Sequence, residues 1–127
     1  MPGAIPYFSY ADGKAAMAFL EAAFGFESLA AYADDKGGLM HGEMKRGDVA
    51  IMLGARPADA PGPAAPAPLG TYLVVDDVDA VFVRAINAGG TEIWAPHDTE
   101  FGTRRARLAD PEGFEWSLGT YVPDAAS

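Results

Sequence analysis

The chain carries one pattern twice, and this repeat limits the possible folds more than any other feature. In each half a strand-like segment leads into a helix, glycine ends the helix, and further short strand-like segments follow. Landmarks of the two halves match at nearly constant offsets: Asp12 with Asp77, Gly25 with Gly89 or Gly90, and Gly47 with Gly113. The pattern therefore predicts two tandem modules with the same order of elements.

Alternation, helical spacing and turn residues place the elements within each module. The first module is predicted to hold strands at residues 4–10, 27–33, 39–45 and 49–53, with a helix at 14–24. The second is predicted to hold strands at residues 70–75, 91–94, 103–109 and 114–120, with a loop at 95–102. Its helix follows Asp76 or Asp77 as N-cap, just as Asp12 precedes the first helix. Both modules then read β-α-β-β-β, and a hydrophobic content of 50% supplies a core for them.

A proline-rich segment separates the two modules. Proline removes backbone donors and favours an extended linker over a strand or helix. Five prolines occur here: Pro57, Pro61, Pro63, Pro66 and Pro68. The predicted organisation is a first module at residues 1–53, a Pro/Ala-rich linker at 54–69, a second module at 70–120 and a tail at 121–127.

The charge and the absence of cysteine exclude several functions. With 18 acidic against 9 basic residues the net charge is −9, which repels phosphate backbones and argues against nucleic-acid binding. The same charge attracts cationic small molecules, although it also serves solubility. Without cysteine the chain has no disulfide, thiolate metal site or thiol nucleophile. The sequence shows neither a signal peptide nor a membrane-spanning apolar run, so we expect a cytoplasmic protein without a membrane partner.

Four segments together resemble the glyoxalase/bleomycin resistance protein/dioxygenase (vicinal oxygen chelate) superfamily. They are AAMAFLEAAFGFE, GLMHGEMKRGDVAIML, YLVVDDVDAVFVRAINAGG and ARLADPEGFEWSLGTY. The segments MHGEM and WSLGTY are most similar to the phosphonate-operon-type branch of this superfamily, whose activity is unassigned. The resemblance implies an α+β fold of two tandem βαβββ modules. Their curved, mostly antiparallel sheets would surround a central cup, with the helices on the convex faces.

Metal-dependent members of that family hold a divalent cation through His, Glu or Gln on the first and last strands of each module. The resemblance places these four positions at Ile5, Met52, Gly70 and Ser117. None offers a side chain that a divalent ion prefers, so no metal or other cofactor is expected. The remaining candidates for a metal site are His41, Glu43, Glu92, His97 and Glu115. Among them, His41 and Glu43 share one strand face, and a two-residue shift of the last strand would bring in Glu115.

With Ile5 directed into the cup, strand alternation divides the side chains between two faces. The cup face then carries Ile5, Tyr7, Ser9, Ala50, Met52, Gly70, Tyr72, Val74, Glu115, Ser117 and Gly119. The opposite face, under the helices, carries Phe8, Ile51, Leu53, Leu73, Val75, Phe114, Trp116 and Leu118. Such a cup is apolar and aromatic with few polar groups, which suits a flat organic ligand.

The predicted ligand-binding residues are Tyr7, His41, Met52, Tyr72, Trp94, Phe101 and Glu115. The tyrosines and the methionine supply stacking and soft contacts, and the other two aromatic residues a rim. Simpler alternatives are core or dimer packing for the aromatic residues and a solvated strand position for His41. Glu115 either anchors a cation or, as we favour, pairs with Arg105 or Arg107, while Arg104 faces the other way. No catalytic residue is predicted, because no serine has a neighbouring base.

Three functions follow as hypotheses. The first is a metal-independent protein that binds or sequesters a small organic molecule, with cationic drugs as one class. The second is a metal-dependent lyase, isomerase or dioxygenase of the same superfamily, which metal content would separate from the first. The third is an interaction module whose own side chains fill the cup. The resemblance also implies a homodimer, and the linker permits the modules to pair within one chain or between two.

Overall fold

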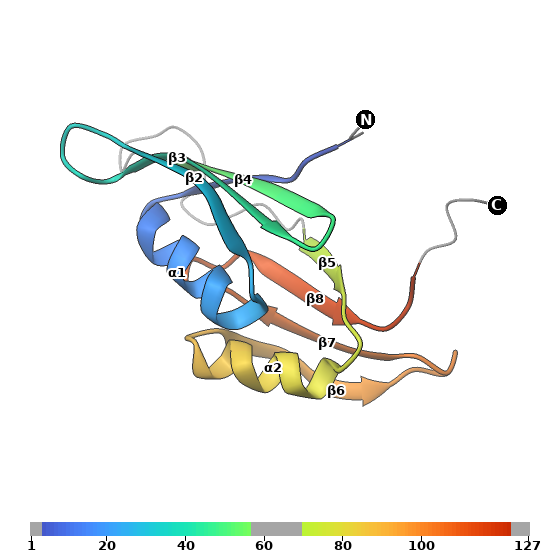
Figure 1. Ribbon diagram of the computed structural model, residues 1–127. Helices are drawn as coiled ribbons and strands as arrows, with labels where there is room; N and C mark the ends of the chain where they lie inside the picture. The colour runs from blue at the N-terminus through green and yellow to red at the C-terminus, as the bar shows by residue number, and fades with distance from the viewer. Residues whose placement is uncertain (1–3, 57–69, 123–127) are drawn as a thin grey trace.

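The computed structural model describes residues 4–56 and 70–122 (Figure 1). Module 1 contains β1 (Tyr7–Tyr10), α1 (Gly13–Phe24), β2 (Glu27–Ala33), β3 (Leu39–Arg46) and β4 (Val49–Ala55). Module 2 contains β5 (Gly70–Val74), α2 (Val78–Asn87), β6 (Thr91–Asp98), β7 (Arg104–Ala109) and β8 (Glu115–Gly119). The predicted α+β fold of two tandem βαβββ modules is confirmed. Neither helix in this part of the chain is long and apolar enough to cross a membrane.

Each module forms its own four-stranded mixed sheet. The strand orders are β1-β4-β3-β2 and β5-β8-β7-β6, so the first and last strands of each module pair in parallel and the other neighbours are antiparallel. The same register recurs in both sheets, because Tyr7 lies opposite Met52 and Tyr72 lies opposite Ser117. The repeat in the sequence is therefore also a repeat of strand register.

Both helices begin at the aspartates that the sequence indicated. The Asp12 carboxylate accepts a hydrogen bond from the Ala15 amide at 3.0 Å, and Asp77 does the same for Ala80 at 3.0 Å. Of the two candidate caps in module 2, the cap is thus Asp77. Helix α1 ends at Gly25, whose φ of 77° lies in the left-handed region that glycine adopts without a Cβ clash.

The two modules share one hydrophobic core. Trp116 of β8 is fully buried, and its rings lie 5.2 Å from Phe8 of β1 and 5.1 Å from Phe24 of α1, measured between centroids. The residues predicted to lie under the helices are buried, apart from the partly buried Phe114 that packs against the same cluster. Burying these large side chains at about 25 cal/mol per Å² is the main force that holds the modules together.

Polar contacts also join the modules at both ends of α1. The Glu112 carboxylate, in the turn between β7 and β8, accepts from the backbone amides of Ala11 at 2.7 Å and Asp12 at 2.8 Å. At the other end, Arg84 of α2 donates to the Ala22 carbonyl at 2.6 Å, which satisfies a carbonyl in the last turn of α1. Helix α1 therefore lies against α2, and the residues that lead into it are joined to the β7–β8 turn (Figure 1).

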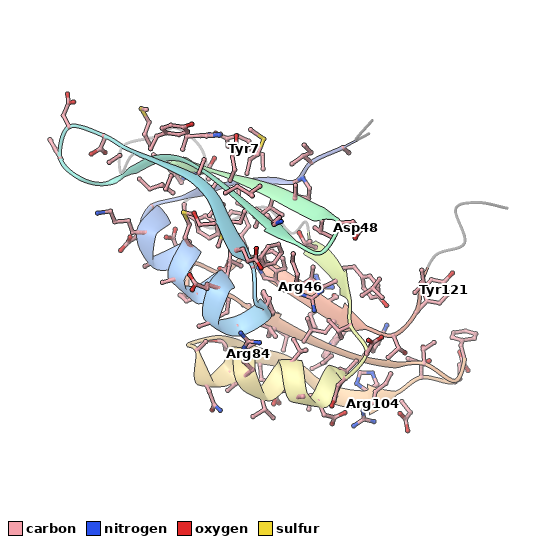
Figure 2. All side chains as sticks on the ribbon, in the orientation of Figure 1. Tyr7, Arg46, Asp48, Arg84, Arg104 and Tyr121 are labelled. Atoms are coloured by element: carbon pink, nitrogen blue, oxygen red, sulfur yellow. The ribbon has the colours of Figure 1, made fainter. Side chains whose placement is uncertain are left out.

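The shared core determines where the free faces of the two sheets point. Phe8 and Trp116 stack across the junction, so the buried faces of both sheets are directed at the same core. Since alternate side chains leave a sheet on opposite sides, the other faces point away from that core and away from each other. Tyr7 accordingly lies on the side of its sheet opposite α1 (Figure 2). Within the described residues the sheets form no closed barrel around a single cup.

Some predicted boundaries are wrong. Strand β6 continues to Asp98, through the segment predicted as a loop, because an edge strand tolerates Pro96 and the register shifts that flank Trp94. Strand β4 runs to Ala55, two residues into the predicted linker, while β1 begins only at Tyr7. The rest of the predicted linker beyond Arg56, and the tail beyond Val122, lie outside the described residues.

Candidate functional site

The outer face of module 1 carries a row of aromatic rings. The ring of His41 on β3 lies 6.1 Å from that of Tyr7 and 6.3 Å from that of Tyr32, measured between centroids. His41 Nε2 also lies 3.0 Å from a Glu43 carboxylate oxygen, which orients the imidazole. Met52 of β4 lies beside Tyr7 in the strand register. This face brings together three of the predicted residues: Tyr7, His41 and Met52.

A tyrosine lies over a glycine at the equivalent place in both modules. The hydroxyl end of Tyr7 covers Gly54, and that of Tyr72 covers Gly119, so closely that a Cβ on either glycine would collide with the phenol. The Tyr72 hydroxyl also donates to the Tyr121 carbonyl at 2.8 Å. Glycine at these two positions leaves room for the two phenol rings to approach the strand.

The outer face of module 2 contains a charged network around Arg107. Its Nε lies 2.7 Å from a Glu115 carboxylate oxygen, and its Nη1 donates to the Ser117 hydroxyl at 3.0 Å. The favoured alternative for Glu115, an ion pair with a strand neighbour, is thus confirmed with Arg107 as the partner. Because this carboxylate is already neutralised, it is a poor anchor for a cationic ligand.

Arg105, two residues earlier on the same strand face, has different surroundings. Its guanidinium carbon lies 4.7 Å from the centroid of the Trp94 ring, within the range of a cation–π contact. Its Nε donates to His97 Nε2 at 3.3 Å, and His97 Nδ1 lies 2.8 Å from the Ala95 carbonyl. Trp94, which is 44% exposed, therefore lies on the outer face and stacks with an arginine of the same chain.

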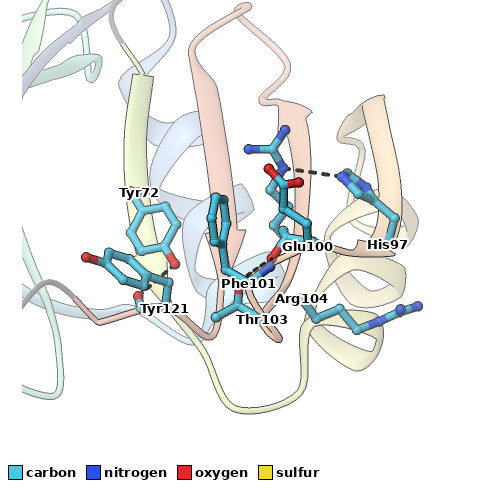
Figure 3. Close-up of a pocket in the computed structure, with 9 residues that line it drawn as sticks. Tyr72, His97, Glu100, Phe101, Thr103, Arg104 and Tyr121 are labelled. Atoms are coloured by element: carbon cyan, nitrogen blue, oxygen red, sulfur yellow. Dashed lines mark hydrogen bonds between the residues drawn. The ribbon is translucent and has the colours of Figure 1, made fainter.

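A pocket of about 820 Å³ opens at this end of module 2 (Figure 3). Aromatic residues from β5, the β6–β7 loop and the chain after β8 form one part of its wall, and polar residues of β6, β7 and the loop between them form the rest. The lining consists of Tyr72, His97, Thr99, Glu100, Phe101, Thr103, Arg104, Arg105 and Tyr121. Phe101 is 81% exposed and lies in the turn between β6 and β7.

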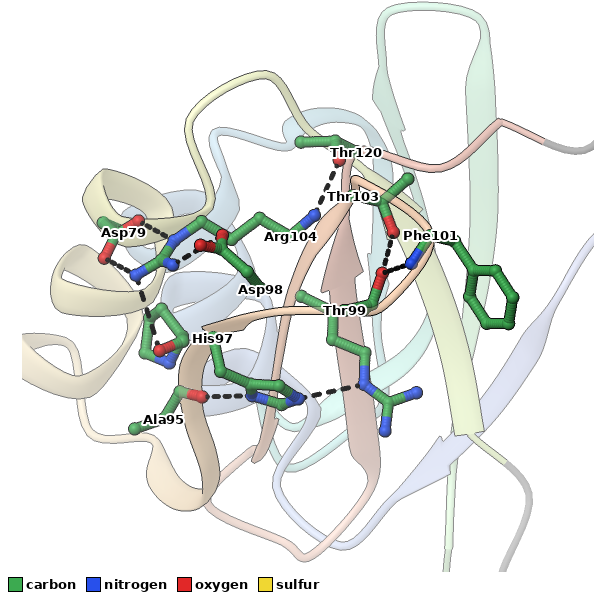
Figure 4. Close-up of polar contacts among 11 residues, drawn as sticks. Asp79, Ala95, His97, Asp98, Thr99, Phe101, Thr103, Arg104 and Thr120 are labelled. Atoms are coloured by element: carbon green, nitrogen blue, oxygen red, sulfur yellow. Dashed lines mark hydrogen bonds and ion pairs between the residues drawn. The ribbon is translucent and has the colours of Figure 1, made fainter.

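The β6–β7 hairpin, which carries most residues of this wall, is anchored through Arg104 (Figure 4). Arg104 faces opposite to Arg105 and donates to Asp79 of α2 at 2.6 Å and to Asp98 at 2.9 Å. The hydrogen bond from Arg104 holds the pKa of Asp79 below its ordinary value. A side-chain hydrogen bond of 2.7 Å between Thr99 and Thr103 closes the hairpin tip. The loop thus has a defined shape before any ligand binds.

The four positions that the sequence predicted for the family's metal ligands offer no side chain that suits a divalent cation. Ile5 precedes β1, Met52 offers only a thioether, and Gly70 has no side chain. The fourth, Ser117, already accepts a hydrogen bond from Arg107. Across residues 4–56 and 70–122, no three His, Cys, Asp or Glu side chains cluster closely enough to hold a metal ion. The donor set therefore supports no chemical step at a metal.

The structure separates the predicted ligand-binding residues into two groups. Tyr7, His41 and Met52 lie on module 1, whereas Tyr72, Trp94, Phe101 and Glu115 lie on module 2. Sequence reasoning did not assign Tyr121, Thr99 or Arg105 to a site. The signal for Arg105 was strand alternation, which places it on the same face of β7 as Arg107. Thr99 lies in the segment that the sequence predicted as a loop, so no side-chain direction was assigned to it.

Comparison with known proteins identifies the family that shares this architecture. A family model described as the Glyoxalase/Bleomycin resistance protein/Dioxygenase superfamily matches residues 8–118. An uncharacterized protein of Mycobacterium bovis is 33% identical over 129 aligned positions, which cover 95% of this chain and 84% of the relative.

Two solved structures share the fold. TioX from Micromonospora sp. ML1 is 23% identical with a TM-score of 0.73, over 94% of this chain and all of TioX. A bleomycin resistance determinant encoded on transposon Tn5 is 22% identical with a TM-score of 0.70, over 97% of this chain and all of that one.

Proposed function

This chain belongs to the glyoxalase/bleomycin resistance protein/dioxygenase superfamily, and on that premise we propose that it binds a small planar organic molecule without a metal. The cup that holds this molecule lies between two copies of the chain. Module 1 of one copy supplies one wall, and module 2 of the other supplies the opposite wall. The segments MHGEM and WSLGTY support a place in the phosphonate-operon-type branch.

The observation that carries this proposal is the opposed direction of the two outer faces. Each face presents exposed aromatic side chains, Tyr7 and Tyr32 on module 1 and Tyr72 and Trp94 on module 2. Each face also holds only two of the four family positions. In a dimer, the module 2 face of the second copy would lie opposite the module 1 face of the first, and the reverse. This arrangement would cover the aromatic rings and enclose a ligand.

The charges at this site disfavour a cationic drug as the ligand. The net charge of −9 favours their approach over long distances. At the site itself, however, Glu115 is paired with Arg107, and Arg105 adds a positive charge that would repel a cation. Local charge decides binding at contact distance, because long-range fields are screened within about 10 Å.

The proposal predicts a dimer whose melting temperature rises with planar aromatic compounds. Sedimentation should give twice the mass of the chain. A ligand at tenfold its dissociation constant should stabilise the fold by about 1.4 kcal/mol, or roughly 5 °C in Tm. Met52→Glu on module 1 and Trp94→Ala on module 2 should each abolish most of this shift, because both walls contact the ligand.

Val83→Ala is the matched control, since Val83 is an exposed aliphatic residue of α2 outside both faces. It should dimerise and respond like the unaltered protein. A full thermal shift in the Met52→Glu variant would contradict the shared cup. The absence of any shift across a broad panel of bicyclic aromatic compounds would contradict ligand binding itself.

A further inference from the structure

The three arginines of β7, Arg104, Arg105 and Arg107, differ in how their charge is balanced. Arg104 is paired with Asp79 and Asp98, and Arg107 with Glu115. Within the part of the chain that the structure describes, Arg105 forms no ion pair, although Trp94 and His97 hold it in place. The chain has 18 acidic residues for 9 basic ones, so a shortage of carboxylates does not explain this.

The hydrogen bonds of His97 fix the direction of the Arg105 guanidinium. A carbonyl only accepts, so the 2.8 Å contact with the Ala95 carbonyl requires a proton on His97 Nδ1. In the neutral imidazole, Nε2 is then the acceptor for the Arg105 Nε proton at 3.3 Å. Among the described residues, the two terminal nitrogens of Arg105 have no hydrogen-bond partner. They form the planar fork that binds a carboxylate through two parallel hydrogen bonds.

The rest of the pocket wall is suited to a flat ring. Tyr72 and Tyr121 lie on one side of the pocket and His97 on the other, with Phe101 between them (Figure 3). The Tyr72 hydroxyl is already bonded to the Tyr121 carbonyl, so this residue offers a ligand its ring face. A molecule in this space would meet apolar rings at one end and a cationic fork at the other.

Glu100 also lines the pocket and limits how much negative charge a ligand can bring. Its carboxylate forms no ion pair within the described residues. Because repulsion grows with charge, Glu100 would oppose a phosphate-like dianion more strongly than a ligand with one negative charge.

We propose that the ligand of this pocket is an aromatic monocarboxylate, and that Arg105 binds its carboxylate while the Tyr72, Tyr121 and Phe101 rings contact its apolar body. This inference rests on the proposed function, since it names the class of molecule that the same site takes. Arg105 is then the residue that determines specificity for charge.

The test compares three probes of the same shape by isothermal titration calorimetry on the full chain. They are naphthalene-2-carboxylate, its neutral primary amide and the cation 2-naphthylmethylammonium. A charge-assisted bidentate contact should make the carboxylate bind about tenfold more tightly than the amide. Arg105→Gln should remove this preference and leave amide binding unchanged, while Glu100→Gln should strengthen carboxylate binding a few-fold. Lys36→Gln, which removes one positive charge in the β2–β3 turn, should keep the preference and is the matched control.

Each other outcome has a definite meaning. Equal affinity for carboxylate and amide, or a preference that survives in Arg105→Gln, would overturn the role of Arg105 while leaving ligand binding intact. Tightest binding of the ammonium probe would overturn it in favour of cationic ligands. If none of the three probes binds while other planar aromatic compounds raise the melting temperature, this inference is overturned and the proposed function stands. If no compound of the broader panel does so either, both fail.

Discussion

Replacement of Asp110 by alanine should lower the free energy of unfolding by about 3 kcal/mol, because it leaves several buried donors without an acceptor. Asp110 is 3% exposed, in the turn between β7 and β8. One carboxylate oxygen accepts from Tyr10 Oη at 2.6 Å and from Trp116 Nε1 at 3.3 Å. The other accepts from the backbone amides of Glu112 and Phe114, both at 3.0 Å. Asp110 thus joins the turn of module 2 to β1 of module 1.

Asp110→Asn separates this role from that of the negative charge. The amide keeps one acceptor oxygen for the backbone amides but places an NH₂ group toward the Trp116 donor, so we expect a loss of roughly 1–2 kcal/mol. Chemical denaturation followed by circular dichroism measures both values. A loss below 1 kcal/mol in Asp110→Ala would show that water replaces the carboxylate without cost.

The pH dependence of stability should also change in Asp110→Asn. Burial raises the pKa of Asp110 above its ordinary value of 3.8, so the folded protein holds this proton more tightly than the unfolded chain. The resulting stabilisation is complete below pH 3.8 and is lost as pH rises through the folded-state pKa. The difference in unfolding free energy between the unaltered protein and Asp110→Asn should therefore vary with pH between 3.8 and the folded-state pKa of Asp110. Above that pKa the difference should remain constant.

Trp116→Ala is expected to cost about 3–5 kcal/mol, the usual range for removing a large aromatic side chain from a core. The Trp116 ring contacts Phe8, Phe24 and Phe26, all of module 1, although it belongs to module 2. The cavity would therefore open at the junction of the modules, where neither module can close it alone. Urea denaturation should show one earlier transition for both modules, with no separate unfolding step.

Trp94→Ala serves as the internal control for residue type. Trp94 lies half-exposed on the outer face, with Arg105 and Arg107 at cation–π distance, so its loss should change stability by less than about 1 kcal/mol. Equal destabilisation by the two tryptophan substitutions would contradict the shared core.

Much of the fold follows from local sequence. Asp12 and Gly25 delimit α1 because side-chain capping and a left-handed backbone are properties of single residues. The division of strand side chains into buried and outer faces, such as Phe8 against Tyr7, also follows, since alternation depends only on the extended backbone. These rules act over a few residues and need no knowledge of the rest of the chain.

The direction of the two faces could not be predicted in this way. Alternation shows that Tyr7 and Tyr72 leave their sheets on the side away from the core, but not whether those sides meet within one chain. That outcome depends on contacts between distant residues, such as Phe8 with Trp116 and Arg84 with the end of α1. The sequence indicated an ion pair for Glu115, because a strand neighbour supplies the arginine. It did not indicate that Arg105 contacts Trp94 and His97, because that depends on how β6 bends.

The opposed faces of the two modules have a genetic consequence. In a dimer of the proposed kind, each chain gives its module 1 face to one cup and its module 2 face to the other. When an allele altered at Met52 and another altered at Arg105 are expressed together, a mixed dimer has one cup with both changes and one with neither. Two alleles that are each inactive alone would then complement one another, whereas two alleles altered in the same module would not.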